Sequence, residues 1–143
     1  MSQATPQFFD ALHERWRGRT PEEETRVVRS VLVHLRRRLP GPEFRHLDEE
    51  FPPDLRAMWA EPEIERPDRK RPIEPVDRNQ FLAAVQREAG LPDLADAEIA
   101  TAAVFHALGR FVSPDEAIHI GAQLPKGLNE LWNREVGPGR AAA

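Results

Sequence analysis

Apolar side chains recur at intervals of three and four residues along most of the chain, with polar and charged side chains between them. This period is typical of amphipathic α-helices that bury one face. Proline and glycine interrupt the period and mark the ends of successive segments. The pattern predicts an all-α protein with helices over residues 5–18, 20–39, 43–51, 54–59, 77–90, 93–111, 113–124 and 128–132.

The first half of the chain is a divergent copy of the second half. When the sequence is displaced by 73 positions, residues 7–59 align with residues 80–132 without a gap and with 11 identities in 53 pairs. A repeat of this length predicts two related structural units. We expect two four-helix units, residues 1–60 and 77–136, packed as one helical bundle with their long second helices together at the centre.

Residues 61–76 separate the two units and differ from both in composition. The segment EPEIERPDRKRPIEPV has four prolines, many charged side chains and no apolar period, so we expect an extended linker. A linker of this length permits the units to pack within one chain or to exchange between two chains, which leaves a homodimer open. Residues 137–143 carry no large apolar side chain and are predicted to be a disordered tail.

Several segments carry the sequence signature of a helix start. Thr5 and Pro6 supply an N-cap and a first-turn proline. The segments TPEE at residues 20–23 and SPDE at residues 113–116 have the form of a capping box, and Asp77 precedes Gln80 at the same spacing. These signatures fix the expected starts of four of the helices.

The second unit carries a run of residues that identifies a family. The residues are Phe81-Leu82, Ala97, Ala100, Val104, Leu108-Gly109-Arg110, Glu116-Ala117, Gln123-Leu124-Pro125 and Leu128. On these residues the chain resembles a bacterial family known as domain of unknown function 2267, which is all-helical with a recurring EA…QLP segment. The first unit keeps Arg37, Glu43, Pro52 and Leu55 but has Phe44 in place of the alanine and Glu50-Phe51-Pro52 in place of QLP. The resemblance implies a fold and no particular activity.

The composition narrows the classes of function. The chain of 143 residues has no cysteine, which excludes disulfides, thiolate metal sites and cysteine nucleophiles and suits a reducing compartment. No apolar run reaches the roughly 18 residues of a membrane span, and the first residues lack the layout of a secretory signal. The net charge of −4 disfavours nucleic-acid binding. We expect a cytoplasmic protein with no membrane contact, and the scarcity of lysine beside arginine indicates GC-rich coding in a bacterium.

The sequence Glu-x-x-His occurs at matched positions of the two units, as Glu43 with His46 and Glu116 with His119. This spacing puts both side chains on one helix face, as in the di-metal carboxylate sites of ferritin-like bundles. Those sites take further glutamates from two other long helices. Both glutamates here stand in a first helical turn, where capping and the helix dipole also account for them. The four residues are candidate metal ligands, with surface or boundary positions as the alternative.

The remaining histidines and the matched tryptophans suggest structural positions. His13, His34 and His106 stand on separate predicted helices without a partner nearby in sequence, so we expect them to be half-buried or exposed. Trp59 and Trp132 each follow a leucine by one helical turn and are expected to seal the core.

Arginines flank the apolar stripe of the helix over residues 20–39. Arg29, Arg36 and Arg37 are the candidates for an interaction surface that binds an acidic partner. Nucleic-acid binding through the same face is a second interpretation. A solvated helix face, balanced by the glutamates at residues 22–24, is a third.

No glycine-rich phosphate loop and no nucleophilic triad stands out in the sequence. We therefore expect a protein without catalytic residues or a cofactor, which acts as an interaction module for another protein. The alternatives are a metal-binding protein that uses the paired Glu-x-x-His motifs and a nucleic-acid-binding accessory protein that uses the arginine-rich face.

Overall fold

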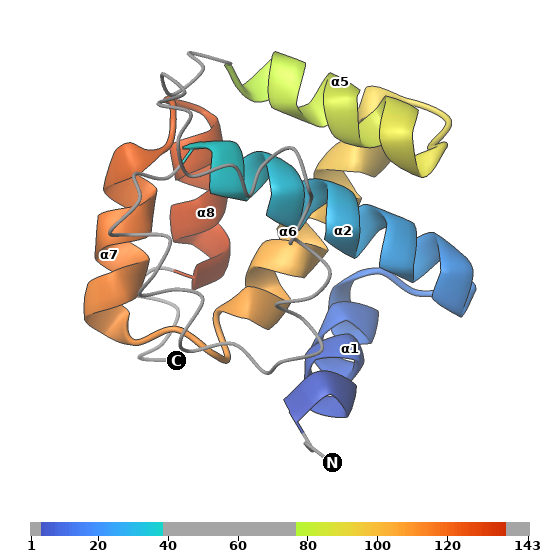
Figure 1. The fold of residues 1–143 in the computed structure, drawn as a ribbon, viewed down its shortest axis with the longest axis horizontal. Coiled ribbons are helices and arrows are strands. Elements are labelled where there is room, and N and C mark those ends of the chain that lie inside the picture. Colours follow the sequence, from blue (N-terminus) through green and yellow to red (C-terminus); the bar gives the residue numbers. More distant parts are fainter. Residues whose placement is uncertain (1–3, 39–76, 137–143) are drawn as a thin grey trace, which may run out of the picture.

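The protein is all-helical in the computed structural model, which describes residues 4–38 and 77–136 (Figure 1). In these two ranges the chain forms six α-helices and no strand, which confirms the predicted fold class for this part. The helices are α1 (Ala4–Arg15), α2 (Pro21–Arg38), α5 (Arg78–Ala89), α6 (Leu94–Leu108), α7 (Pro114–Gln123) and α8 (Leu128–Val136). The predicted helices over 43–51 and 54–59, the linker 61–76 and the tail 137–143 lie outside the described residues.

Helix starts follow the predicted caps with one exception. The Thr20 hydroxyl accepts a hydrogen bond from the Glu23 N–H at 3.1 Å, and the Thr20 N–H donates back to the Glu23 carboxylate at 2.9 Å. Asp77 and Gln80 form the same reciprocal pair at the start of α5. These bonds satisfy N–H groups that have no partner inside the helix. The predicted start of α1 is wrong by one residue, because α1 begins at Ala4 and therefore includes Thr5.

Helix ends depend on local backbone geometry. Gly90 ends α5 in the left-handed region with φ 70°, a conformation in which glycine has no steric cost. Helix α6 ends at Leu108 rather than at the predicted residue 111. The N–H groups of Arg110 and Phe111 bond back only three residues, to Ala107 and Leu108, so the last turn is tightened and no longer α-helical.

Helix α6 lies at the centre of the fold. Its buried residues occupy almost every side of the helix from Ala97 onward: Ala97, Ala100 and the whole run Thr101–Leu108. Many of them are alanines, whose small side chains let neighbouring helices approach closely. Helices α1, α2, α5 and α8 all pack against α6, and Figure 1 shows α6 behind α2 in the middle of the molecule.

The first helix of each unit packs on the second helix of the other unit, and α5 also packs on α6 of its own unit. Helix α1 of the first unit packs on α6 of the second unit, and α5 of the second unit packs on α2 of the first. The long second helices α2 and α6 also contact each other, which confirms the prediction that they meet at the centre. Because each unit supplies part of the cover for the other, the described helices share one hydrophobic core.

Trp132 closes the core between α7 and α8. Its side chain is fully buried, its ring meets Phe105 edge-on at 5.0 Å, and its indole N–H donates to the Ala117 carbonyl at 2.8 Å. A buried indole needs such a partner for its one donor. The predicted sealing role is confirmed for Trp132, whereas Trp59 lies outside the described residues.

Truncation of Leu12, a fully buried side chain of α1, tests whether the units form one body. Leu12→Ala is expected to lower the free energy of unfolding by about 3 kcal/mol. Because α1 packs on the other unit, α2 and α7 should lose amide protection together in urea, in a single transition. Ile118→Ala, at an exposed position, should change stability by less than about 0.5 kcal/mol. Two separate transitions would show that the units fold independently.

Candidate functional site

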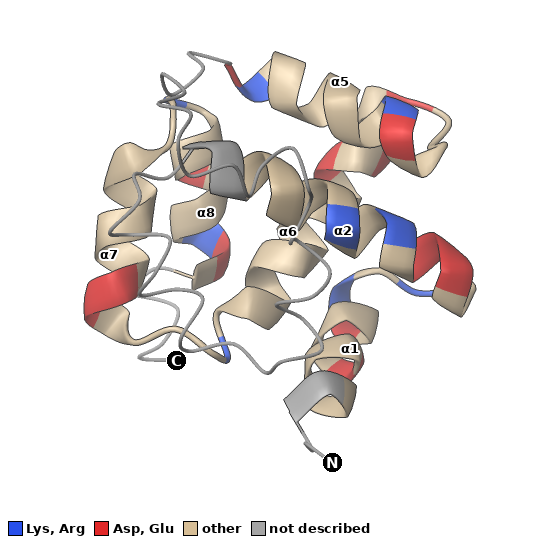
Figure 2. Ribbon diagram, viewed as in Figure 1, with Lys and Arg blue, Asp and Glu red and all other residues tan. Residues whose placement is uncertain are grey.

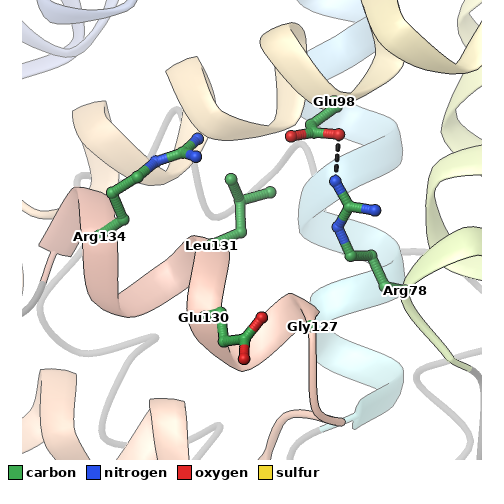
Figure 3. A pocket seen from close by; sticks show the side chains of 6 residues that line it. All are labelled: Arg78, Glu98, Gly127, Glu130, Leu131 and Arg134. Atoms are coloured by element: carbon green, nitrogen blue, oxygen red, sulfur yellow. Dashed lines mark hydrogen bonds and ion pairs between the residues drawn. The ribbon is translucent and has the colours of Figure 1, made fainter.

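A pocket of about 440 Å³ lies where the starts of α5 and α8 meet the side of α6 (Figure 3). Its floor is Leu131, which is itself buried. Two arginines and two glutamates stand around this floor, and Gly127 completes the wall. The lining residues are Arg78 from α5, Glu98 from α6, Gly127 before α8, and Glu130, Leu131 and Arg134 from α8.

The charges of the pocket are only partly paired. Arg78 forms an ion pair with Glu98 across the α5–α6 boundary, as Figure 3 shows. The Arg134 Nε lies 3.2 Å from the carboxylate of its neighbour Glu135. Glu130 forms no ion pair with another residue of 4–38 or 77–136. Both basic groups therefore already have a carboxylate partner, and the unpaired charge of the pocket is negative.

Gly127 lets the backbone before α8 lie against the stem of Arg78. Its φ is 89°, and a Cβ atom there would be 3.0 Å from Arg78 Cδ and 3.1 Å from Arg78 Cβ. Both the backbone conformation and the close approach therefore require glycine. The pocket wall depends on this contact, because it holds the Arg78 stem beside the first turn of α8.

Large apolar side chains are exposed beside the pocket. Among the described residues the exposed large apolar side chains are Leu94 at 41%, Ile99 at 51% and Ile118 at 51%. Leu94 stands one helical turn before the pocket residue Glu98, so the two share a side of α6. Ile99 directly follows Glu98, whereas Ile118 stands apart on α7. The N-terminal half of α6 thus carries two exposed aliphatic side chains and one glutamate of the charged pocket.

A second group of functional side chains gathers where α1 ends. His106 on α6 is buried, and its Nε2 lies 2.8 Å from a Glu14 carboxylate oxygen on α1. The same oxygen accepts a hydrogen bond from Arg110 at 3.2 Å. The prediction of a half-buried or exposed His106 is therefore wrong, because α1 packs over this side of α6 and supplies the partner that a buried imidazole needs.

The other two histidines also have glutamate partners on another helix. His34 Nε2 on α2 lies 2.8 Å from Glu88 on α5, and the Ser30 hydroxyl donates to the second Glu88 oxygen at 2.7 Å. His13 Nε2 lies 2.6 Å from the buried Glu24 on α2, although this approach lacks the angles of a hydrogen bond. His34 is half-buried and His13 exposed, as predicted. The sequence contains no local signal for these partners.

Glu135 on α8 is buried among basic groups. One of its oxygens accepts no hydrogen bond and lies 3.6 Å from Arg15 Nε and 4.0 Å from His106 Nδ1. The adjacent residues His13, Glu14 and Arg15 of α1 therefore contact α2, α6 and α8 respectively. This end of α1 connects four helices through charged side chains.

The pKa of the Glu14 carboxyl is lowered by this network. The hydrogen bond with His106 is the largest cause of the lower pKa, partial burial opposes it, and the positive charge of Arg110 adds to it. These effects favour the ionised carboxylate of Glu14 in the folded protein. The contact between α1 and α6 is thus a contact to a charged group.

The candidate metal ligands are only partly described. Glu116 is buried in the first turn of α7, where its N–H donates to Ser113, and His119 is exposed one turn later. Glu43 and His46 lie outside the described residues. Within residues 4–38 and 77–136, no group of three or more His, Asp or Glu side chains is placed to hold a metal ion. The paired-motif metal site stays a prediction.

The basic side chains of the first unit are interleaved with acidic ones. Arg29 is exposed on α2, and Figure 2 shows acidic residues in the first turn of that helix with basic residues following them. Arg36 and Arg37 belong to α2, but their side chains lie outside the described part. Arg19 binds Asp96 at 3.0 Å and lies over the Trp16 ring. The described arginines thus include several that already bind carboxylates.

Comparison with known families identifies the family of the chain. A model of the family described as "Uncharacterized conserved protein (DUF2267)" matches the chain twice, over residues 5–83 and 78–143. The chain belongs to the DUF2267 family. The two matches confirm both the predicted family and the duplicated unit of this DUF2267 protein. No curated protein matches the chain. None of the described helices is long and apolar enough to cross a membrane.

Gly127→Ala should destabilise the DUF2267 protein by about 1–2 kcal/mol, because alanine is strained at positive φ and its Cβ would press on Arg78. Gly109→Ala is a matched control, since Gly109 has no positive φ and its Cβ would meet no atom closer than 3.4 Å. Thermal unfolding of both variants measures the difference. Equal stability of the two variants would contradict the role assigned to Gly127.

The stability of the protein is expected to depend on pH through the Glu14 carboxyl. Because its folded pKa lies below the ordinary value of 4.5, the ionised carboxylate stabilises the fold above that pH. This contribution is lost as the pH falls through the lowered pKa. Between pH 5 and pH 3 the melting temperature should therefore fall further for the native protein than for Glu14→Gln. Equal falls would show that Glu14 does not contribute.

Proposed function

We propose that this DUF2267 protein is a non-catalytic interaction module that binds another protein through the N-terminal half of α6. The proposed surface, the α6 docking face, consists of Leu94, Glu98 and Ile99 with the neighbouring pocket residues Glu130 and Leu131. The observation that carries the proposal is the pair of exposed aliphatic side chains on α6 beside a pocket. Single exposed apolar residues are ordinary, but two of them on a helix that also lines a pocket favour recognition.

The charge of the α6 docking face indicates the chemistry of the partner. Asp93 caps α6, Asp96 and Glu98 stand in its first turns, and Glu130 of α8 lines the pocket together with Glu98. Arg19 and Arg78 are already bound to Asp96 and Glu98, so the charge left for a partner is negative. A helix that carries aliphatic side chains between lysines or arginines is complementary to this surface.

The positions of the titratable side chains support a role without catalysis. His34 and His106 each pair with a glutamate on another helix, and neither lines the pocket beside α6 or the open pocket of about 400 Å³ that is lined by Asp10, His13, Glu14 and Arg17. Their contacts serve the packing of helices. A general acid or base would need to face a space that a substrate can enter.

Other parts of the proposal rest on the sequence. Arg29, Arg36 and Arg37 are a further proposed contact region, for an acidic segment of a partner. The absence of cysteine supports a cytoplasmic location, and the scarcity of lysine beside arginine supports a bacterial source. Metal binding and nucleic-acid binding stay alternatives that no contact of the described residues favours.

Site-specific photo-crosslinking in living cells tests the α6 docking face. A photoreactive amino acid at position 99 should form an adduct with one protein through a basic helix of that protein. The same group at position 118 is the matched control, because Ile99 and Ile118 are equally exposed on different helices. Ile99→Asp should then weaken binding of the purified partner at least about tenfold, while Ile118→Asp leaves it unchanged.

Three results would contradict the proposal. Equal adducts from positions 99 and 118 would show that the α6 docking face has no special role. A partner that binds equally well to Ile99→Asp would place the contact elsewhere. Turnover of a metabolite by the purified protein would exclude a purely non-catalytic function.

A further inference from the structure

The same type of helix contact occurs twice between the two units. In both crossings the first helix of one unit packs on the second helix of the other unit, as α1 on α6 and α5 on α2. Each crossing holds a glutamate from the first helix against a histidine from the second helix. The pairs are Glu14 with His106 and Glu88 with His34, and both have a carboxylate oxygen 2.8 Å from Nε2.

The two pairs are equivalent in space but not in the aligned sequence. With the displacement of 73 positions, His34 aligns with Ala107, one residue after His106. Glu88 aligns with Arg15, one residue after Glu14. Each pair is thus displaced by one residue from the other, although it joins the corresponding helices. The same kind of bond therefore closes both crossings with residues that are not matched in the repeat.

Two carboxylates from other helices face the His106 ring. Glu14 from α1 faces Nε2, Glu135 from α8 faces Nδ1 at 4.0 Å, and Arg110, just past the end of α6, also binds Glu14. Protonation gives the imidazole a donor on both nitrogens, so that it can donate to Glu14 and approach the Glu135 oxygen that has no hydrogen bond.

Two arginines compete for the same carboxylates, but they are more exposed to water. The side chains of Arg110 and Arg15 are 51% and 50% exposed, whereas that of His106 is 4% exposed. Water screens the charge of the arginines more strongly than that of the buried imidazole. A positive charge on His106 would therefore attract Glu14 and Glu135 despite the neighbouring arginines.

His34 has simpler surroundings. Glu88 from α5 is the charged side chain that contacts its ring, and Phe81 of the same helix packs edge-on at 6.0 Å. From α6, which α2 also contacts, no described charged side chain reaches His34. The Ser30 hydroxyl on the second Glu88 oxygen fixes the carboxylate in place. Protonation of His34 adds an ionic attraction to a carboxylate that is already oriented.

We propose that the Glu14–His106 and Glu88–His34 pairs form a proton-dependent clasp between the two units, tighter when the two histidines are protonated and looser when they are neutral. Histidine changes its charge between about pH 5 and pH 8, so the clasp responds within the range that a cell experiences. The pKa of the Glu14 carboxyl is lowered from its ordinary value of 4.5, so this partner is ionised across the range. The clasp does not depend on the proposed binding function, because none of its residues belongs to the α6 docking face.

Urea unfolding of the full chain at pH 5.5 and pH 8.0 tests the clasp. Each pair is expected to contribute about a threefold change, the size of a partly exposed ion pair. The unfolding equilibrium constant of the native protein should therefore be about tenfold larger at pH 8.0 than at pH 5.5. The double variant Glu14→Gln/Glu88→Gln, which keeps both histidines, should reduce this ratio to about twofold or less, and each single variant should give an intermediate ratio.

His119→Gln is the matched control, because His119 is an exposed histidine on α7 outside both crossings, and it should keep the tenfold ratio. A native protein equally stable at both pH values, or a ratio unchanged in the double variant, would overturn the clasp.

Discussion

The burial of α6 on almost every side is the constraint on which the rest of the structure depends. A helix with one apolar stripe needs one neighbour, but α6 presents apolar surface around most of its circumference and must be covered from several directions. The first unit supplies α1 and α2 for this cover, and the second supplies α5 and α8. Because neither set covers α6 alone, the duplicated units are parts of one core, and the short side chains of Ala100 and Ala103 keep the surrounding helices close.

This arrangement also determines where charged and exposed groups lie. The end of α1 reaches three other helices, so the adjacent residues His13, Glu14 and Arg15 become contacts between helices rather than a solvated surface. Toward the start of α6 the helix is less covered, and Ile99 is exposed there beside the pocket of α5 and α8. Stabilising charges and the proposed α6 docking face thus occupy opposite ends of the same helix.

The sequence predicted the features that depend on residues close together in the chain. The apolar period and the caps at Asp77 and Ser113 located the helices, because these signals involve residues only three or four positions apart. The sequence did not predict that the first helix of each unit packs on the second helix of the other, because the same apolar stripe fits a partner in either unit. The partners of His34 and His106 lie 54 and 92 positions away, so their burial and charge follow only from the tertiary packing.

The packing of helices across the two units constrains how the duplicated chain can evolve. After a duplication, one copy is ordinarily free to accumulate changes while the other preserves the fold. Here a substitution on α1 alters the packing of α1 against α6, which belongs to the other copy. A substitution in one half therefore affects the stability of both. Compensating changes must arise across the repeat, and the identities that survive, such as Val31 with Val104 and Leu35 with Leu108, are fully buried in both copies. Selection for stability therefore acts on the two copies together, because they share one core.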